Sequence, residues 1–195
     1  MYDVVTNILD NARVELPGVT DAMVSIGLFN ALDEFCRRSD ANRFNVQVPL
    51  TEGVQEYYIT FPDTVVIRIF EIIHPNMDTQ GAWYDPDDGK LTLPRAPDVN
   101  EAMEPVNINM SFAPKVGVTD IAEVMPELIW HRFYNTLIDG VISKCAAQIA
   151  KPWTHERKAT YHGKRFRNGT MQAKAMAQVG FAPDSAGWRY PTWTR

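Results

Sequence analysis

The sequence of 195 residues has few cysteines and no long hydrophobic run. Cys36 and Cys145 each lie beside apolar residues in a helical pattern, which predicts buried free thiols rather than a disulfide and fits a reducing compartment. No apolar stretch approaches the roughly 20 residues that cross a bilayer. Residues 1–16 carry acids where a secretory signal has a basic region and a long apolar one. We therefore expect a chain that is neither exported nor bound to a membrane.

The sequence also lacks the short motifs of common catalytic sites, including a Gly-rich phosphate loop, GxSxG and HExxH. His155, Glu156 and His162 could share a helix face, but their basic neighbours oppose cation binding. The segment DPDDG, residues 85–89, is similar to the start of a calcium loop, yet Ala96 stands where that loop needs a bidentate Glu. We expect a turn there, no required metal or cofactor, and a protein that is not an enzyme.

Apolar residues at three- and four-residue spacing predict four helices, over residues 3–15, 20–37, 126–150 and 154–178. A Pro17-Gly18 turn separates the first two, so they are expected to pack as an antiparallel pair. Thr154 is expected to cap the last helix. The apolar stripes of these helices predict one shared core that contains Leu28, Leu32, Phe35, Phe133, Leu137 and Val141.

The middle of the chain changes to alternating periodicity, which predicts strands at 44–50, 57–61, 64–73, 90–93 and 106–112. Thr51-Glu52-Gly53 is expected to form a hairpin turn between the first two strands. The segment 64–73 is almost wholly apolar, which predicts a strand covered on both faces. The loop 94–105 between the last two strands is bounded by prolines.

The order of these elements predicts an α+β fold, and the βαβ alternation of a doubly wound sheet is absent. Residues 1–42 and 120–180 are expected to form the main part, an α-helical bundle. Residues 43–119 would be an inserted antiparallel β-rich domain. Residues 181–195, which we call the C-terminal tail, hold aromatic residues, Pro and Gly without either period, which predicts an extended segment.

Positive charge is concentrated near the C-terminus of a chain whose formal net charge is −5. Residues 151–195 contain nine Lys or Arg and two acids, a net of +7, so the remainder carries −12. Such an asymmetry indicates a binding partner, because net charge acts on association rather than on the fold. The candidates for contact with an anionic surface or with DNA are Arg157, Lys158, Lys164, Arg165 and Arg167.

Two interpretations of this basic segment remain open. In the first, the cations contact phosphates while Trp153, Tyr161 and Phe166 stack on bases. In the second, the segment is an amphipathic helix whose cations face water or an acidic neighbour. A buried stripe formed by Trp153, Ala159, Phe166 and Ala173 favours the second interpretation, and no recognition-helix motif accompanies the cations.

Several segments, in their order along the chain, resemble the head-to-tail adaptor (connector) proteins of short-tailed and related tailed bacteriophages. An opening helix ends at LPG, and ALDEFCRRSD (31–40) and GVQEYYITFP (53–62) follow. MPELIWHRFYNTLIDGVISKCAAQIAKPW (125–153) and NGTMQAKAMAQVG (168–180) complete the set. Phe35 with its polar flanks and the KPW that joins the last two helices match best, and the β-rich middle matches least.

The resemblance implies a structural virion protein at the head–tail junction, made in the host cytoplasm. Such adaptors form a ring, commonly of about twelve copies, between the portal protein and the tail tube or nozzle. The double-stranded DNA genome passes through the channel of the ring. In this family the C-terminal segment reaches toward the portal, and large aromatic residues suit such an interface. The implied portal-contact residues are Phe181, Trp188, Arg189, Tyr190, Trp193 and Arg195.

Two other classes of function stay open. A stand-alone nucleic-acid-binding protein would use the basic segment, residues 151–169, but gives no role to the β-rich middle or the C-terminal tail. A hydrolase acting on a polymer would need carboxylates that converge in a cleft, whereas Asp85, Asp87 and Asp88 have the pattern of turn residues.

Overall fold

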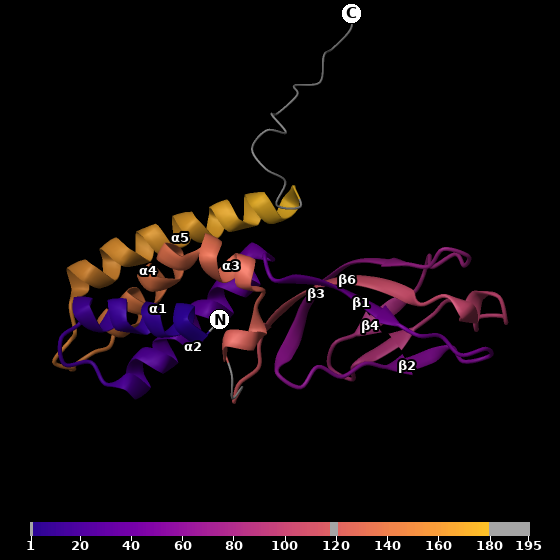
Figure 1. Cartoon of the computed structure of the whole chain (residues 1–195), viewed down its shortest axis with the longest axis horizontal. Helices are drawn as coiled ribbons and strands as arrows, with labels where there is room; N and C mark the ends of the chain where they lie inside the picture. The colour runs from indigo at the N-terminus through magenta and orange to yellow at the C-terminus, as the bar shows by residue number, and fades with distance from the viewer. Residues whose placement is uncertain (1, 118–120, 180–195) are drawn as a thin grey trace, which may run out of the picture.

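The computed structural model describes residues 2–117 and 121–179 and has a mixed α+β fold. Helices occupy both ends of the described chain, and the strands between them form two antiparallel three-stranded sheets. Figure 1 shows the helices gathered at one end of the molecule and the strands at the other. The C-terminal tail lies outside the described residues.

The α-helices are α1 (Tyr2–Glu15), α2 (Asp21–Ser39), α3 (Glu127–Arg132), α4 (Tyr134–Ala146) and α5 (Glu156–Gln178). The helices predicted at 3–15, 20–37 and 154–178 are confirmed to within a few residues, although His155 rather than Thr154 is the N-cap of α5.

The single helix predicted over 126–150 is wrong. Phe133, with φ −109° and ψ 19°, leaves helical geometry and separates α3 from α4. Its ring packs against Phe35 of α2, with the ring centroids 5.3 Å apart. After Ala146 the chain turns back, and the backbone N–H of His155 donates to the carbonyl of Ala146 at 3.0 Å. The helical spacing of apolar residues continues in the sequence through Phe133 and past Ala146. The two breaks therefore depend on tertiary contacts.

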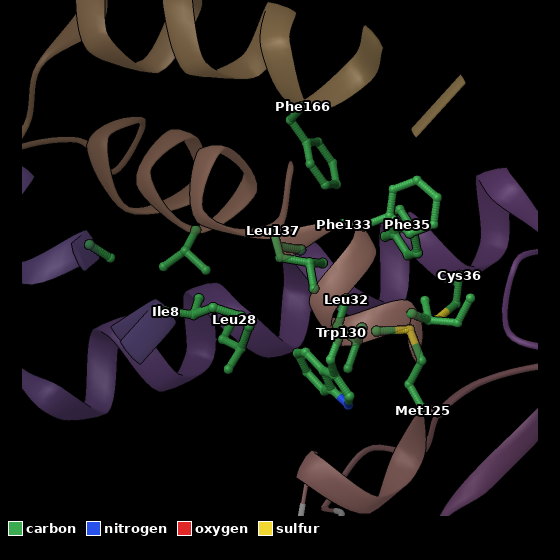
Figure 2. Packing of buried hydrophobic residues seen from close by; sticks show 14 of the residues in the cluster. Ile8, Leu28, Leu32, Phe35, Cys36, Met125, Trp130, Phe133, Leu137 and Phe166 are labelled. Atoms are coloured by element: carbon green, nitrogen blue, oxygen red, sulfur yellow. The ribbon is translucent and has the colours of Figure 1, made fainter. Parts of the chain in front are cut away.

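The helices share one buried apolar cluster, and all six residues expected in a common core belong to it. Figure 2 shows side chains of α1, α2, α4 and α5 meeting in this cluster, among them Ile8, Leu28, Leu137 and Phe166. Trp130 of α3 is fully buried there, and its indole N–H donates to the carbonyl of Ala122 at 3.1 Å. Cys36 and Cys145 lie in the same cluster as free thiols, as expected.

The strands are β1 (Arg43–Val48), β2 (Glu56–Tyr58), β3 (Thr64–Ile73), β4 (Trp83–Asp85), β5 (Lys90–Thr92) and β6 (Val106–Pro114). The sheets have the orders β1-β6-β3 and β2-β5-β4. The predicted hairpin between β1 and β2 is wrong, because these strands belong to different sheets. Sequence reasoning also missed β4, a strand of three residues that ends where the DPDDG segment begins.

Strand β3 reaches two apolar clusters. Val65 and Ile67 pack against the helical cluster, while Val66, Ile69 and Ile72 pack against a second cluster formed by the sheets. This double contact explains why nearly every side chain of β3 is apolar. The expected full cover of both faces is wrong, however, because β3 is an edge strand with half-buried or exposed residues, and the central strand is β6.

The link from α2 to β1 joins the helical and sheet parts through buried polar groups. Asp40, the C-cap of α2, has a left-handed φ of 53°, and its carboxylate accepts bonds from Arg68 at 2.9 Å and Ser111 at 3.3 Å. The side-chain amide of Asn42 donates to the carbonyls of Phe112 and Val124. These contacts connect α2 to the sheet and to the segment that leads into α3.

Candidate interaction surfaces

Helix α5 covers α4 and buries one apolar stripe. Phe166 and Ala173 are buried in the helical cluster, and Trp153 and Ala159 pack against it, as the sequence predicted. The backbones approach closely at Gly169, where an added Cβ would lie 2.2 Å from Oγ1 of Thr136. The stripe therefore fixes which face of α5 points away from the molecule.

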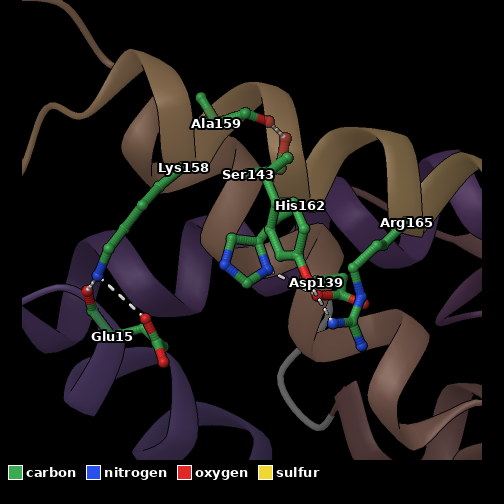
Figure 3. Close-up of polar contacts among 8 residues, drawn as sticks. Glu15, Asp139, Ser143, Lys158, Ala159, His162 and Arg165 are labelled. Atoms are coloured by element: carbon green, nitrogen blue, oxygen red, sulfur yellow. Dashed lines mark hydrogen bonds and ion pairs between the residues drawn. The ribbon is translucent and has the colours of Figure 1, made fainter.

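Two of the five candidate cations are neutralised within the chain (Figure 3). Asp139 of α4, which is 5% exposed, accepts from Nδ1 of His162 at 2.6 Å and from Nε of Arg165 at 2.9 Å. Lys158 donates to the carboxylate of Glu15 at 3.0 Å, and this hydrogen bond, aided by the charge of Lys158, lowers the pKa of Glu15. Lys158 and Arg165 thus attach α5 to α1 and α4.

The remaining candidates lie on the solvent side of α5. Among the described residues, Arg157, Lys164 and Arg167 have no carboxylate partner within salt-bridge distance. Tyr161 lies between them with 56% of its surface exposed, and its hydroxyl accepts from Arg165 at 3.0 Å. We call the surface formed by Arg157, Thr160, Tyr161, Lys164 and Arg167 the outer face of α5. After Glu156 this helix contains no acidic residue, so its outer face is strongly positive.

The structure separates the aromatic residues of the basic segment. Phe166 is 3% exposed, and Trp153 is half-buried with its indole N–H bonded to Gln148 at 3.1 Å. Phe166 therefore cannot stack on a base, so the first interpretation of the basic segment loses one of its three stacking aromatics. Tyr161 remains accessible. The six implied portal-contact residues all belong to the C-terminal tail, outside the described residues.

A second surface, which sequence reasoning missed, is an apolar groove of about 490 Å³ beside the β1-β6-β3 sheet. Phe44, Phe61 and Phe112 form its aromatic floor, with the Phe112 ring centroid 4.7 Å from Phe61 and 5.6 Å from Phe44. Asp63 and Glu123 are exposed at its edge, and no Lys or Arg of the described chain lines it. We call this surface the acidic groove.

The side chains once considered as metal ligands have other partners. Nδ1 of His155 accepts from the backbone N–H of Lys158, and His162 is bonded to Asp139. The DPDDG segment forms the expected turn, in which the Asp85 carboxylate accepts from the N–H of Asp87 at 3.0 Å and Gly89 has a φ of 65°.

None of the helices within the described ranges combines the length and the apolar character that crossing a membrane requires. No family model matches the sequence, and no curated protein matches it significantly. The described surfaces and the resemblance noted above are therefore the basis for a functional proposal.

Proposed function

We propose that this protein is a head-to-tail adaptor of a tailed bacteriophage. It is a structural virion protein that forms a ring of about twelve copies between the portal and the tail tube or nozzle. The genomic DNA passes through the channel of that ring. The order of the segments that resemble such adaptors supports this proposal, and so does the division of apolar residues into a helical cluster and a sheet cluster.

In this proposal the helices of residues 1–42 and 120–180 are the bundle, and residues 43–119 are a domain inserted into it. Asp40 and Asn42 would hold the two parts in a fixed orientation, because both are buried and bonded across the boundary, to Arg68 and to the carbonyl of Phe112, respectively. A fixed orientation suits a ring subunit, whose two lateral surfaces must repeat with the same geometry in every copy.

One observation carries the proposal: the outer face of α5 presents cations that no carboxylate of the described residues neutralises. Arg157 and Lys164 line a shallow depression with Tyr161, and Glu156 at the start of the helix is its one acidic lining residue. A helix face with an aromatic residue among cations suits an anionic partner. An adaptor has such partners, namely other copies, the portal and the genome.

The same observation supports a second candidate, a stand-alone nucleic-acid-binding protein that uses residues 151–169. Arg157, Lys164 and Arg167 could each contact a phosphate, and the affinity for DNA would then fall steeply as salt rises. This candidate predicts a monomer, whereas an adaptor forms a ring.

Native mass spectrometry and electron microscopy of the purified chain, with and without portal protein, separate the two candidates. We expect rings, and we expect them to bind the portal end of filled heads. A monomer that binds DNA with a steep salt dependence and ignores the portal would contradict the adaptor proposal.

A further inference from the structure

The described chain carries opposite charge in its two parts. Residues 43–117, which contain the two sheets, have five Lys or Arg and eleven Asp or Glu, a net of −6. Residues 156–179, which contain α5, have six Lys or Arg and one Glu, a net of +5. The first region includes most of the acidic groove, and the second includes the outer face of α5.

No described cation of the sheet region forms a salt bridge with a carboxylate of the acidic groove, although Lys115 lies beside Asp63 and its backbone N–H donates to the carbonyl of Asp63 at 2.9 Å. Arg68, Lys90 and Arg95 form salt bridges with Asp40, Glu56 and Glu101, respectively. By contrast, the carboxylates of Asp63 and Glu123 have no cationic partner among the described residues. The negative charge beside the aromatic floor therefore remains available to a partner.

The two surfaces complement each other in chemistry and in size. The outer face of α5 presents an exposed tyrosine between Arg157 and Lys164, and the acidic groove presents an aromatic floor between Asp63 and Glu123. Aromatic residues with a polar tip are favoured at interface centres, where their rings are buried and their hydroxyls stay bonded. A groove of about 490 Å³ has room for one such side chain.

The surfaces cannot meet within one copy. The buried stripe holds α5 against α4 (Figure 1), so its outer face points away from the body that includes the groove. Contact between them therefore requires two copies. Because the surfaces differ, the contact is head-to-tail, and repetition of such a contact closes a ring when the rotation between copies allows it.

We propose that the outer face of α5 of one copy docks into the acidic groove of the next copy, with Tyr161 on the aromatic floor. Arg157 and Lys164 then face Asp63 and Glu123. This inference deepens the proposed function, since it names the contact between neighbouring copies in the ring. It holds equally for any other homo-oligomer built from this chain.

Charge-reversal variants test the contact. Variant A combines Arg157→Glu with Lys164→Glu, and variant B combines Asp63→Lys with Glu123→Lys. Each variant places like charges opposite each other, so we expect its self-association at low salt, measured by sedimentation velocity, to be more than about tenfold weaker. A one-to-one mixture of A and B places opposite charges at every contact, so it should assemble again. A chain that carries all four substitutions should assemble as well.

Two control variants each reverse one exposed charge elsewhere, in the same direction as A and as B, respectively. Lys151→Glu lies in the loop before α5, and Glu52→Lys lies in the turn after β1; both side chains are exposed. These variants should assemble like the original chain. Circular dichroism melts identify any variant that fails to fold.

A second measurement does not require stable rings. The variants Lys164→Cys and Asp63→Cys, mixed under mild oxidation, should give a disulfide-linked dimer of one copy of each. Neither variant alone should give this dimer in comparable yield, and the native Cys36 and Cys145 are buried.

Three results would overturn the inference: a chain that stays monomeric at high concentration and low salt, reversal variants that assemble normally, or a mixture of A and B that does not recover. Loss of DNA binding in variant A with unchanged assembly would also overturn it and would favour a nucleic-acid partner. Binding to the portal is measured separately. If the mixture of A and B forms rings again but these rings do not bind the portal, the contact between copies is supported and the adaptor proposal is contradicted.

Discussion

At the scale of single residues, the position of α5 depends on close contacts that leave no room for a methyl group. Gly169 faces Thr136 of α4, and Gly140 of α4 faces the ring of Phe166, where an added Cβ would lie 2.8 Å away. In the structure α5 continues through Gly163 and Gly169. Their small size matters for packing against the neighbouring helix.

Gly169→Ala is expected to destabilise the protein although alanine is the better helix former. The gain in helix propensity is about 1 kcal/mol, whereas forcing a methyl group into a packed contact costs about 1–3 kcal/mol. Urea unfolding should therefore show a lower midpoint. Asn168→Ala, at an exposed neighbouring position, should show no loss. Adding Thr136→Ala removes the two closest atoms and should recover part of the stability lost in Gly169→Ala, since Cβ of residue 136 stays 2.9 Å from the added Cβ. A midpoint raised by Gly169→Ala alone would contradict this account.

The two buried thiols predict that stability falls in alkaline solution. Burial raises the pKa of Cys145 to about 11 and raises the pKa of Cys36 as well. Thiols of the unfolded chain ionise near pH 8.5. Above that pH the unfolded state binds fewer protons than the folded state, so the free energy of unfolding decreases as pH rises toward 11. Each thiol contributes up to about 1.4 kcal/mol per pH unit.

Unfolding in urea between pH 8 and pH 10.5 measures this effect. Other groups also titrate in this range, so the comparison is with the variant Cys36→Ala/Cys145→Ala, which lacks both thiols. Its stability should depend less on pH than that of the original chain. Equal slopes for the two proteins would show that the thiols stay accessible to ionisation in the folded state.

At the scale of elements, the end of α2 determines how the helices meet the sheets. Asp40 has a left-handed backbone and a side chain that is 4% exposed, with bonds to Arg68 of β3 and Ser111 of β6. A single residue thus ends a helix, and its carboxylate connects that helix to two strands. The sequence predicted that this helix ends at residue 37, close to its observed end at Ser39. It did not predict that Asp40 bonds to Arg68 and Ser111.

Asp40→Ala is expected to lower the free energy of unfolding by about 2–3 kcal/mol, because Ser111 loses its partner and Arg68 loses a charged acceptor. Asp40→Gly loses the same bonds but suits the left-handed backbone, so it should be more stable than Asp40→Ala by roughly 0.5–1 kcal/mol. Chemical denaturation of both variants measures these differences. If Asp40→Ala unfolds at the same midpoint as the original chain, the carboxylate does not stabilise this junction.

At the scale of the whole molecule, the proposed function divides the contacts among three regions. The outer face of α5 and the acidic groove are proposed to join neighbouring copies, and the C-terminal tail is proposed to reach the portal. The tail contains Phe181, Trp188, Tyr190 and Trp193, and large apolar side chains of this kind are costly to leave in water.

Deleting residues 181–195 is therefore expected to abolish attachment to filled heads while the fold is retained. The described residues already form a helical cluster and a sheet cluster of their own, so we expect the melting temperature to change little. Cosedimentation with portal-bearing heads measures attachment. Trp188→Ala/Trp193→Ala should weaken attachment by at least about tenfold if these residues anchor the interface. Unchanged docking of the truncated chain would contradict the role of the tail.

The sequence by itself determined the features that depend on local periodicity. Three of the four predicted helices, the apolar stripe that contains Phe166 and Ala173, and the turn at 85–89 were all predicted correctly, because each is encoded by residues near one another in the chain. It also located the cations of α5, since charge concentrated in one segment is visible without a structure. These predictions cover most of the helical part and one of the two proposed surfaces.

Only the tertiary structure decided what depends on residues that are distant in sequence. The break at Phe133, the central place of β6 and the pairing of His162 with Asp139 all arise from such contacts. The acidic groove unites Phe44, Phe61 and Phe112 from three strands or their flanks, and no local pattern connects them. Periodicity indicates which side of an element is apolar, but the partner of that side is selected by packing and hydrogen bonding across the whole chain.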